Sequence, residues 1–149
     1  MQLTKNFTLE ELTRSSKAKA LMIDNSPNAE QLANLKALAE NILQPLRDGL
    51  GFPIKITSGL RVPALNKAVK GSRTSQHIYG EAADINVSGK NKVIFDWIVE
   101  NLDFDQIIWE FGTDAEPNWV HVSYKKNEVN RQEKLKAIKQ NGKTKYIKL

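Results

Sequence analysis

The chain has 149 residues, a formal net charge of +5 at pH 7, 40% hydrophobic residues and no cysteine. This length and apolar content suit one globular domain with a substantial core and argue against disorder overall. The missing cysteines exclude disulfides and thiolate metal sites, and no apolar run is long enough to span a bilayer. Residues 1–6 lack the apolar core of a signal peptide, so we expect synthesis in the cytoplasm.

The first 53 residues are expected to be helical. Residues 7–21 open with Thr8-Leu9-Glu10-Glu11, a capping-box pattern that indicates a short amphipathic helix. A second helix is expected from Ser26-Pro27, with the serine as its cap and the proline at its first position. Leucines and isoleucines follow at helical spacing, and Pro45 is expected to kink this helix.

Residues 54–57 alternate in polarity as a strand does, and they run into a turn around Arg61. Glycine and proline on either side of Arg61 indicate that the turn displays the guanidinium. A guanidinium can hold a peptide carboxylate with two hydrogen bonds or stabilise a developing oxyanion. The alternative is a surface arginine paired with a nearby acid. A short helix at 64–69 and a polar loop at 71–76 complete this part.

The chain is organised around the stretch from Ser75 to Asp84, which has the pattern S-x-H-x-x-G-x-A-x-D. It contains His77, one of two histidines; the other, His121, lies in the segment W-V-H-V-S. Two imidazoles and a carboxylate suit a zinc site with a fourth position left for water, although each residue alone is more often a satisfied polar group. The spacing of the helical zinc motif is absent, so we expect these ligands on strands and adjoining loops. Gly80 would let the backbone turn tightly or approach the metal closely.

The rest of the chain predicts a helix at 92–102, a strand at 106–111 and a loop at 112–118. In the basic segment 125–149, Asn-Gly at 141–142 lies between two short alternating runs, which predicts a β-hairpin. This hairpin can be a lid, a binding element or a structural cover, and we favour the cover.

The pattern S-x-H-x-x-G-x-A-x-D followed by W-x-H resembles the peptidase M15 family, the zinc D-Ala-D-Ala carboxypeptidases and related phage endolysins. The hedgehog signalling domain shares their fold, and the resemblance extends from about Ile54 to about Tyr124. It implies an α+β fold in which a small antiparallel sheet carries the zinc site and packs against N-terminal helices. It also implies that His77, Asp84 and His121 bind one Zn²⁺ per chain.

The resemblance implies that Arg61 faces the substrate and that the Ser75 hydroxyl can bind a substrate carboxylate or carbonyl, a local turn bond being the alternative. Two glutamates compete for the role of general base. Many family members have the base in an E-x-x-H spacing, where this chain has Asn118. Glu110 ends a strand among Ile, Trp and Phe, where a carboxylate is costly unless it has a purpose or a partner. The hedgehog-like branch resembles this chain better, because it has a strand-end glutamate upstream of the last ligand, and this resemblance implies Glu110 as the base. The alternative for Glu110 is a salt bridge with a lysine, and we interpret Glu116 as a solvated loop acid.

The implied function is a zinc metallopeptidase that hydrolyses stem peptides or cross-links of bacterial peptidoglycan, as a carboxypeptidase or an endolysin-type endopeptidase. The alternatives are a non-catalytic zinc-containing binding module of the same fold and a basic nucleic-acid-binding domain, which no motif supports. We expect one monomeric domain over residues 1–149, with a helical part at 1–53, a catalytic core at 54–124 and a basic segment at 125–149. We also expect action on the cell wall after release through a holin, as in a phage or prophage lysin.

Overall fold

The computed structural model describes residues 1–149 and is built around a six-stranded sheet with the strand order β1-β2-β4-β3-β5-β6. Its strands are β1 (Ile56–Ser58), β2 (Ala82–Ile85), β3 (Gln106–Glu110), β4 (Trp119–Ser123), β5 (Glu133–Gln140) and β6 (Lys143–Lys148). The expected α+β fold is confirmed, but the sheet is mixed, because β3 and β5 run parallel while all other neighbours are antiparallel. The chain leaves β4 and passes around the start of β3, where Gln132 N–H donates to the Phe104 carbonyl, so β5 enters the sheet in the direction of β3.

The segment expected as one helix over 7–21 forms two short helices, α1 (Leu9–Thr13) and α2 (Ser16–Ala20). Thr8 caps α1 through the capping box that the sequence predicts, with Glu11 as its partner. The break arises at Ser15, which has an extended backbone and accepts the Ala18 N–H through its side chain at 3.1 Å. A residue in this conformation starts a new helix rather than continuing the previous one.

The long N-terminal helix consists of α3 (Ala29–Leu38), the π-helical turn η1 (Ala39–Leu43) and α4 (Gln44–Leu50). Its cap is Asn28 rather than Ser26, because the Asn28 and Gln31 side chains each accept the other's backbone N–H at 2.8 Å. Pro45 lies at the start of α4, directly after the π-helical turn. Proline lacks an N–H and its ring collides with the carbonyl four residues earlier, and a wider turn relieves both problems. The helix therefore continues past Pro45.

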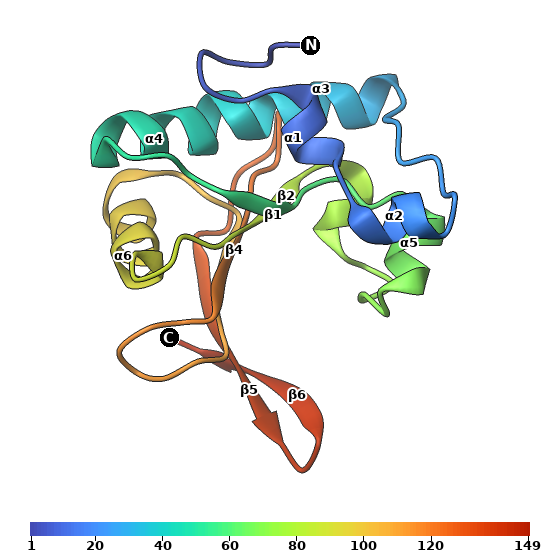
Figure 1. Ribbon diagram of the computed structural model, residues 1–149. Coiled ribbons are helices and arrows are strands. Elements are labelled where there is room, and N and C mark those ends of the chain that lie inside the picture. The colour runs from blue at the N-terminus through green and yellow to red at the C-terminus, as the bar shows by residue number, and fades with distance from the viewer.

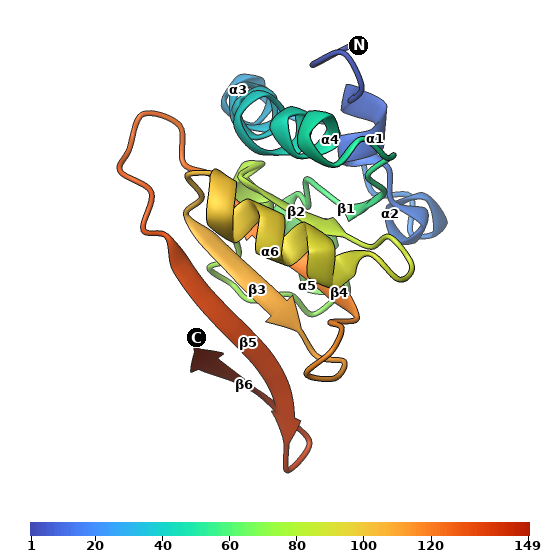
Figure 2. The ribbon, with the colours of Figure 1, turned by 90° about the vertical axis from the view of Figure 1, so that its left-hand side faces the viewer.

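Helices and the apolar core cover one face of the sheet, and polar side chains gather on the other. Figure 2 shows α6 (Asn91–Asn101) lying across β3 and β4, with α3 and α4 above them. Strand residues that point toward these helices are apolar and buried; they are Ala83, Ile85, Ile107, Trp109, Val120 and Val122. Because side chains alternate along a strand, the residues between them, including Asp84 and His121, point to the opposite face. No helix is both long and apolar enough to cross a membrane.

The last two strands form a hairpin that projects from the helical body, at the bottom of Figure 1. Its turn, Asn141-Gly142, has positive φ values of 53° and 76° at the two residues, as the favoured two-residue hairpin turn requires. Every residue of β6 is exposed, and β6 is an edge of the sheet. The hairpin continues the sheet beyond β3, so its side chains also divide between the two faces.

Candidate metal centre

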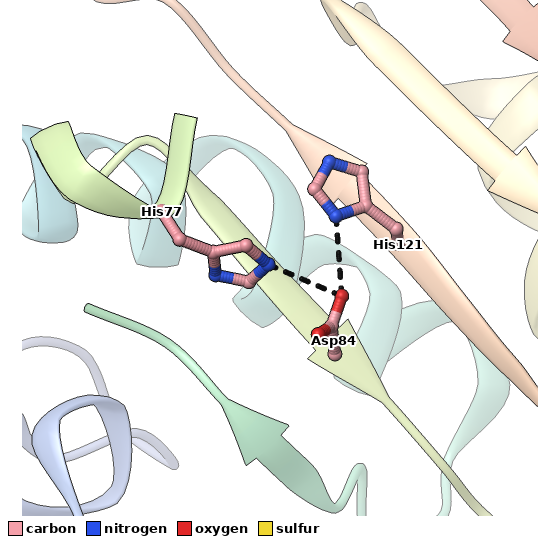
Figure 3. Close-up of side chains that lie close together, drawn as sticks. All are labelled: His77, Asp84 and His121. Atoms are coloured by element: carbon pink, nitrogen blue, oxygen red, sulfur yellow. Dashed lines mark hydrogen bonds and ion pairs between the residues drawn. The ribbon is translucent and has the colours of Figure 1, made fainter. Parts of the chain in front are cut away.

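Two neighbouring strands and one short turn bring His77, Asp84 and His121 together (Figure 3). Asp84 on β2 lies directly opposite His121 on β4, so their side chains share the polar face of the sheet. His77 arrives from η2 (Gln76–Tyr79), a 3₁₀ turn just before β2. The Asp84 Oδ1 atom lies 3.3 Å from His77 Nε2 and 3.1 Å from His121 Nδ1. One ligand atom from each residue lies within 4.8 Å of the others, so the three can hold a metal ion.

The donor set fits zinc chemically as well as geometrically. His77 Nδ1 lies 2.7 Å from the Gly59 carbonyl oxygen, so this nitrogen carries the proton and donates it. That hydrogen bond leaves the lone pair of Nε2 free and aimed at Asp84, which is the arrangement that outer hydrogen bonds give to metal-binding histidines. Two imidazole nitrogens and one carboxylate oxygen form a three-ligand set typical of zinc sites that keep a position open for water or substrate.

The turn that carries His77 is fixed by α3. Gln31 Nε2 donates to the Ile78 carbonyl and Asn34 Nδ2 donates to the Tyr79 carbonyl, each at 2.9 Å. Gly80 ends the turn with φ +74°, and a Cβ there would lie 2.7 Å from the Gln31 carbonyl oxygen. The tight turn expected at Gly80 is present, but its close approach is to the backbone of α3.

The carboxylate of the candidate ligand Asp84 is strongly biased toward its charged form. Burial alone would raise the pKa of Asp84, but in the absence of a metal ion the His77 and His121 imidazoles, when protonated, hold it well below its usual range through charge and hydrogen bonds. An ionised carboxylate is the form that binds a metal. The site is therefore prepared to bind a cation without first losing a proton from its aspartate.

Glu110 lies on the same face, at the end of β3, and lines the same cavity as the three candidate ligands. Its side chain is 8% exposed and makes no hydrogen bond or ion pair. Burial raises the pKa of Glu110 to about 7; His121 and Arg61 act against this rise, and the negative charge of Asp84 adds to it. A carboxyl group with a pKa near the working pH can both accept and return a proton.

Glu116 has a different environment from the one expected. Its Oε1 atom accepts the N–H groups of Asn91, at 2.6 Å, and of Lys92, at 3.3 Å. These donors belong to the first turn of α6, whose unpaired N–H groups attract a carboxylate. Glu116 is thus partly buried and caps a helix, so its interpretation as a solvated loop acid was wrong.

Arg61 and Ser75 meet at the edge of the same cavity. Arg61 Nη2 donates to Ser75 Oγ at 3.3 Å, and Ser75 Oγ also accepts the His77 N–H at 3.2 Å. The local turn bond considered for Ser75 is therefore present together with its contact to the arginine. The Arg61 Nε atom is buried without a partner, and no carboxylate lies within ion-pair distance of the guanidinium. Burial lowers the pKa of Arg61, while Asp84 and Glu110 raise it.

The cavity that contains these residues has a volume of about 830 Å³. The C-terminal hairpin supplies part of its wall, through Leu135, Lys139, Thr144 and Tyr146. Sequence reasoning missed these residues. Alternation along 143–148 places Thr144 and Tyr146 on one face of β6, but which face depends on the pairing of β5 with β3, and no local pattern encodes that pairing.

A family model described as Peptidase M15 matches residues 5–123. No curated protein matches the chain at a significant level. The family match ends at Ser123, the last residue of β4, so β5 and β6 lie beyond it.

Proposed function

The chain belongs to the peptidase M15 family, and we propose that it is a zinc metallopeptidase that hydrolyses stem peptides or cross-links of bacterial peptidoglycan. The observation that carries this proposal is the convergence of His77, Asp84 and His121 beside an unpartnered, buried Glu110. Metal ligands alone would suit a structural site. A carboxyl group kept near neutrality next to them is typical of a hydrolytic one.

His77, Asp84 and His121 would hold the zinc ion, one per chain. When bound, zinc supplies Lewis acidity, which polarises a peptide carbonyl and makes water more acidic. The sheet holds Asp84 and His121 rigidly opposite each other, and η2 holds His77 through its bond to the Gly59 carbonyl. Such support keeps the ligand geometry ready before the ion arrives.

Glu110 is the proton carrier in this proposal. Its carboxylate takes a proton from the attacking water and gives it to the amine that leaves. Its burial and lack of partners support the assignment, because a group committed to an ion pair would hold its proton less readily. Glu116 is a poor candidate, because the first turn of α6 already occupies its carboxylate.

Arg61 binds the substrate, with Ser75 in support. The guanidinium has no acidic partner within the chain and reaches the cavity that contains the metal ligands. It can hold a peptide carboxylate or the oxygen on which negative charge develops. Ser75 orients the guanidinium by accepting its hydrogen bond. Its hydroxyl hydrogen stays available for a substrate oxygen.

The test is digestion of purified peptidoglycan sacculi by the zinc-loaded protein, with and without a chelator, followed by mass spectrometry of the released fragments. We expect cleavage of peptide bonds that the chelator abolishes and added zinc restores. The fragments would also identify the bond and separate carboxypeptidase from endopeptidase action. The Glu110→Gln protein, loaded with zinc to the same level, should release fragments at least about 100-fold more slowly. If the zinc-loaded wild type releases neither peptide fragments nor single amino acids from the sacculi, the proposal is refuted.

A further inference from the structure

The C-terminal hairpin brings a tyrosine to the face of the sheet that holds the candidate metal centre. Cross-strand pairing aligns Tyr146 with Ala137, Ala137 with Glu110, and Glu110 with Trp119. Residues paired in this way project from the same face. Tyr146 therefore lies two strands from Glu110, roughly 10 Å away at the usual strand spacing.

The residue between them is small, which leaves room for the phenol ring above it. Ala137 is fully buried, whereas Tyr146 is 55% exposed and lines the cavity. Burial raises the pKa of Tyr146, and the negative charges of Glu110 and Asp84 raise it further. The phenol thus faces the site as a neutral hydrogen-bond donor.

Lys139 adds a positive charge to the same wall of the cavity. Its Nζ atom donates to Thr144 Oγ1 at 3.2 Å and lies 5.4 Å from the centre of the Phe111 ring. No carboxylate lies within ion-pair distance of it. Thr144 is the cross-strand partner of Lys139 and lies two residues from Tyr146. Lys139 and Tyr146, the two hydrogen-bond donors, are therefore roughly 7 Å apart along the wall.

From this arrangement we propose that the β5–β6 hairpin is a wall of the substrate groove, where Lys139 and Tyr146 bind a carboxylate-bearing residue of the peptide. The proposal rests on the peptidase function and names a feature of its substrate. Arg61 is a second cation in the cavity without an acidic partner. A peptide with two separated carboxylates would match the two cations, one on each.

The hairpin is anchored firmly enough to serve as a wall. The Asp105 side chain is fully buried and accepts hydrogen bonds from the Arg131 backbone N–H and from its guanidinium, just before β5 begins. Asp105 also accepts a bond from Gln76, beside the ligand His77, at 3.0 Å. One carboxylate thus ties the base of the hairpin to the turn that carries a metal ligand. A wall held in this way loses little conformational freedom when a substrate binds.

The test compares two substrates and matched variants. The substrates are a peptidoglycan stem peptide with a free side-chain carboxylate and the same peptide with that carboxylate amidated, both with a free C-terminal carboxylate. On the acidic peptide, Lys139→Ala should lower kcat/KM roughly five- to tenfold, mainly through KM, as expected for a partly exposed charged hydrogen bond. Tyr146→Phe should lower it roughly threefold. On the amidated peptide, Lys139→Ala should change kcat/KM by less than about twofold.

The matched control is Lys145→Ala, which removes the same charge from the same hairpin but on its opposite face. It should leave both substrates unaffected, and Lys139→Arg should retain most of the wild-type rate. Zinc content should stay equal in all variants. Equilibrium binding of the acidic peptide to Glu110→Gln, measured by calorimetry, repeats the comparison without turnover. If the wild type cleaves both peptides and Lys139→Ala affects them equally, the groove wall is refuted while the peptidase function stands. If the wild type cleaves neither peptide and also releases nothing from sacculi, the peptidase function itself fails.

Discussion

Replacing Glu110 by glutamine should make the metal-free protein more stable at alkaline pH while removing its activity. Burial raises the pKa of Glu110 from 4.5 to about 7. In the unfolded chain the carboxyl group ionises near the lower value. At pH values between 4.5 and about 7, the carboxyl group therefore holds a proton in the folded state that it has lost in the unfolded state. The stability that the protonated group provides is therefore complete below pH 4.5 and is lost as the pH rises through 7.

The magnitude follows from the size of the shift. The rise from 4.5 to about 7 corresponds to about 3 kcal/mol, of which about 2.5 kcal/mol is lost between pH 5 and pH 8. Glutamine is neutral throughout and has no such dependence. The free energy of unfolding of Glu110→Gln, relative to that of the wild type, should therefore rise by about 2.5 kcal/mol between pH 5 and pH 8. Hydrolysis by the zinc-loaded variant should fall by roughly 10²- to 10⁴-fold, the usual contribution of a proton-transfer group.

The assay is urea denaturation of both metal-free proteins at several pH values, combined with a rate measurement on the zinc-loaded forms. Glu116→Gln is the matched control. It removes a charge from the start of α6, so it should cost about 0.5–1 kcal/mol and leave the rate near that of the wild type. A stability difference between Glu110→Gln and the wild type that does not change with pH would refute the reasoning. So would a Glu110→Gln enzyme of normal rate.

Three further predictions concern the ligands and their support. His121→Ala should reduce bound zinc from about one per chain to none, measured by elemental analysis, and zinc retained by the variant would refute the ligand set. Gly80→Ala should lower stability to urea by about 2 kcal/mol or more, because φ is positive and the new Cβ meets the Gln31 carbonyl. Gly89→Ala, with the same φ of +74° and open space around it, should cost only about 1 kcal/mol, and equal losses at the two sites would disprove the contact with α3. Burial raises the pKa of Asp105, but hydrogen bonds from Arg131 and Gln76 outweigh it and hold the pKa below its ordinary value of 3.8. The stability that the ionised carboxylate provides is therefore present above pH 3.8, the pKa in the unfolded chain, and is lost as the pH falls through the pKa of the folded state. Asp105→Asn should therefore cost about 1–3 kcal/mol at pH 7 and progressively less as the pH falls below 3.8, and a cost that does not fall in acid would contradict this role.

The structural features that the sequence predicted correctly depend on short-range patterns. Alternating polarity around Asp84 and His121 indicated two strands, and the structure pairs these residues directly. The capping box at Thr8 and the Asn-Gly turn of the hairpin are likewise local signals, because the groups that interact lie within a few residues of each other.

The features that sequence reasoning missed depend on contacts between distant segments. The exception is the start of α3, where two local signals compete: Ser26-Pro27 looked like the helix start, but Asn28 is the cap because Gln31 reciprocates its bond. Glu116 looked solvated because its partner, the start of α6, lies 25 residues away. The parallel pairing of β5 with β3 also joins segments that are far apart in the sequence, and it decides which side chains of the hairpin face the cavity.

The most direct test of the central claim is X-ray absorption spectroscopy at the zinc edge, on protein loaded with one equivalent of zinc. The account predicts two imidazole ligands at about 2.0–2.1 Å, together with oxygen donors from Asp84 and solvent. His77→Ala should remove an imidazole or abolish binding, and His121→Ala should abolish binding. A zinc ion with fewer than two imidazoles in the wild type, or with its ligands unchanged in either variant, would contradict the account.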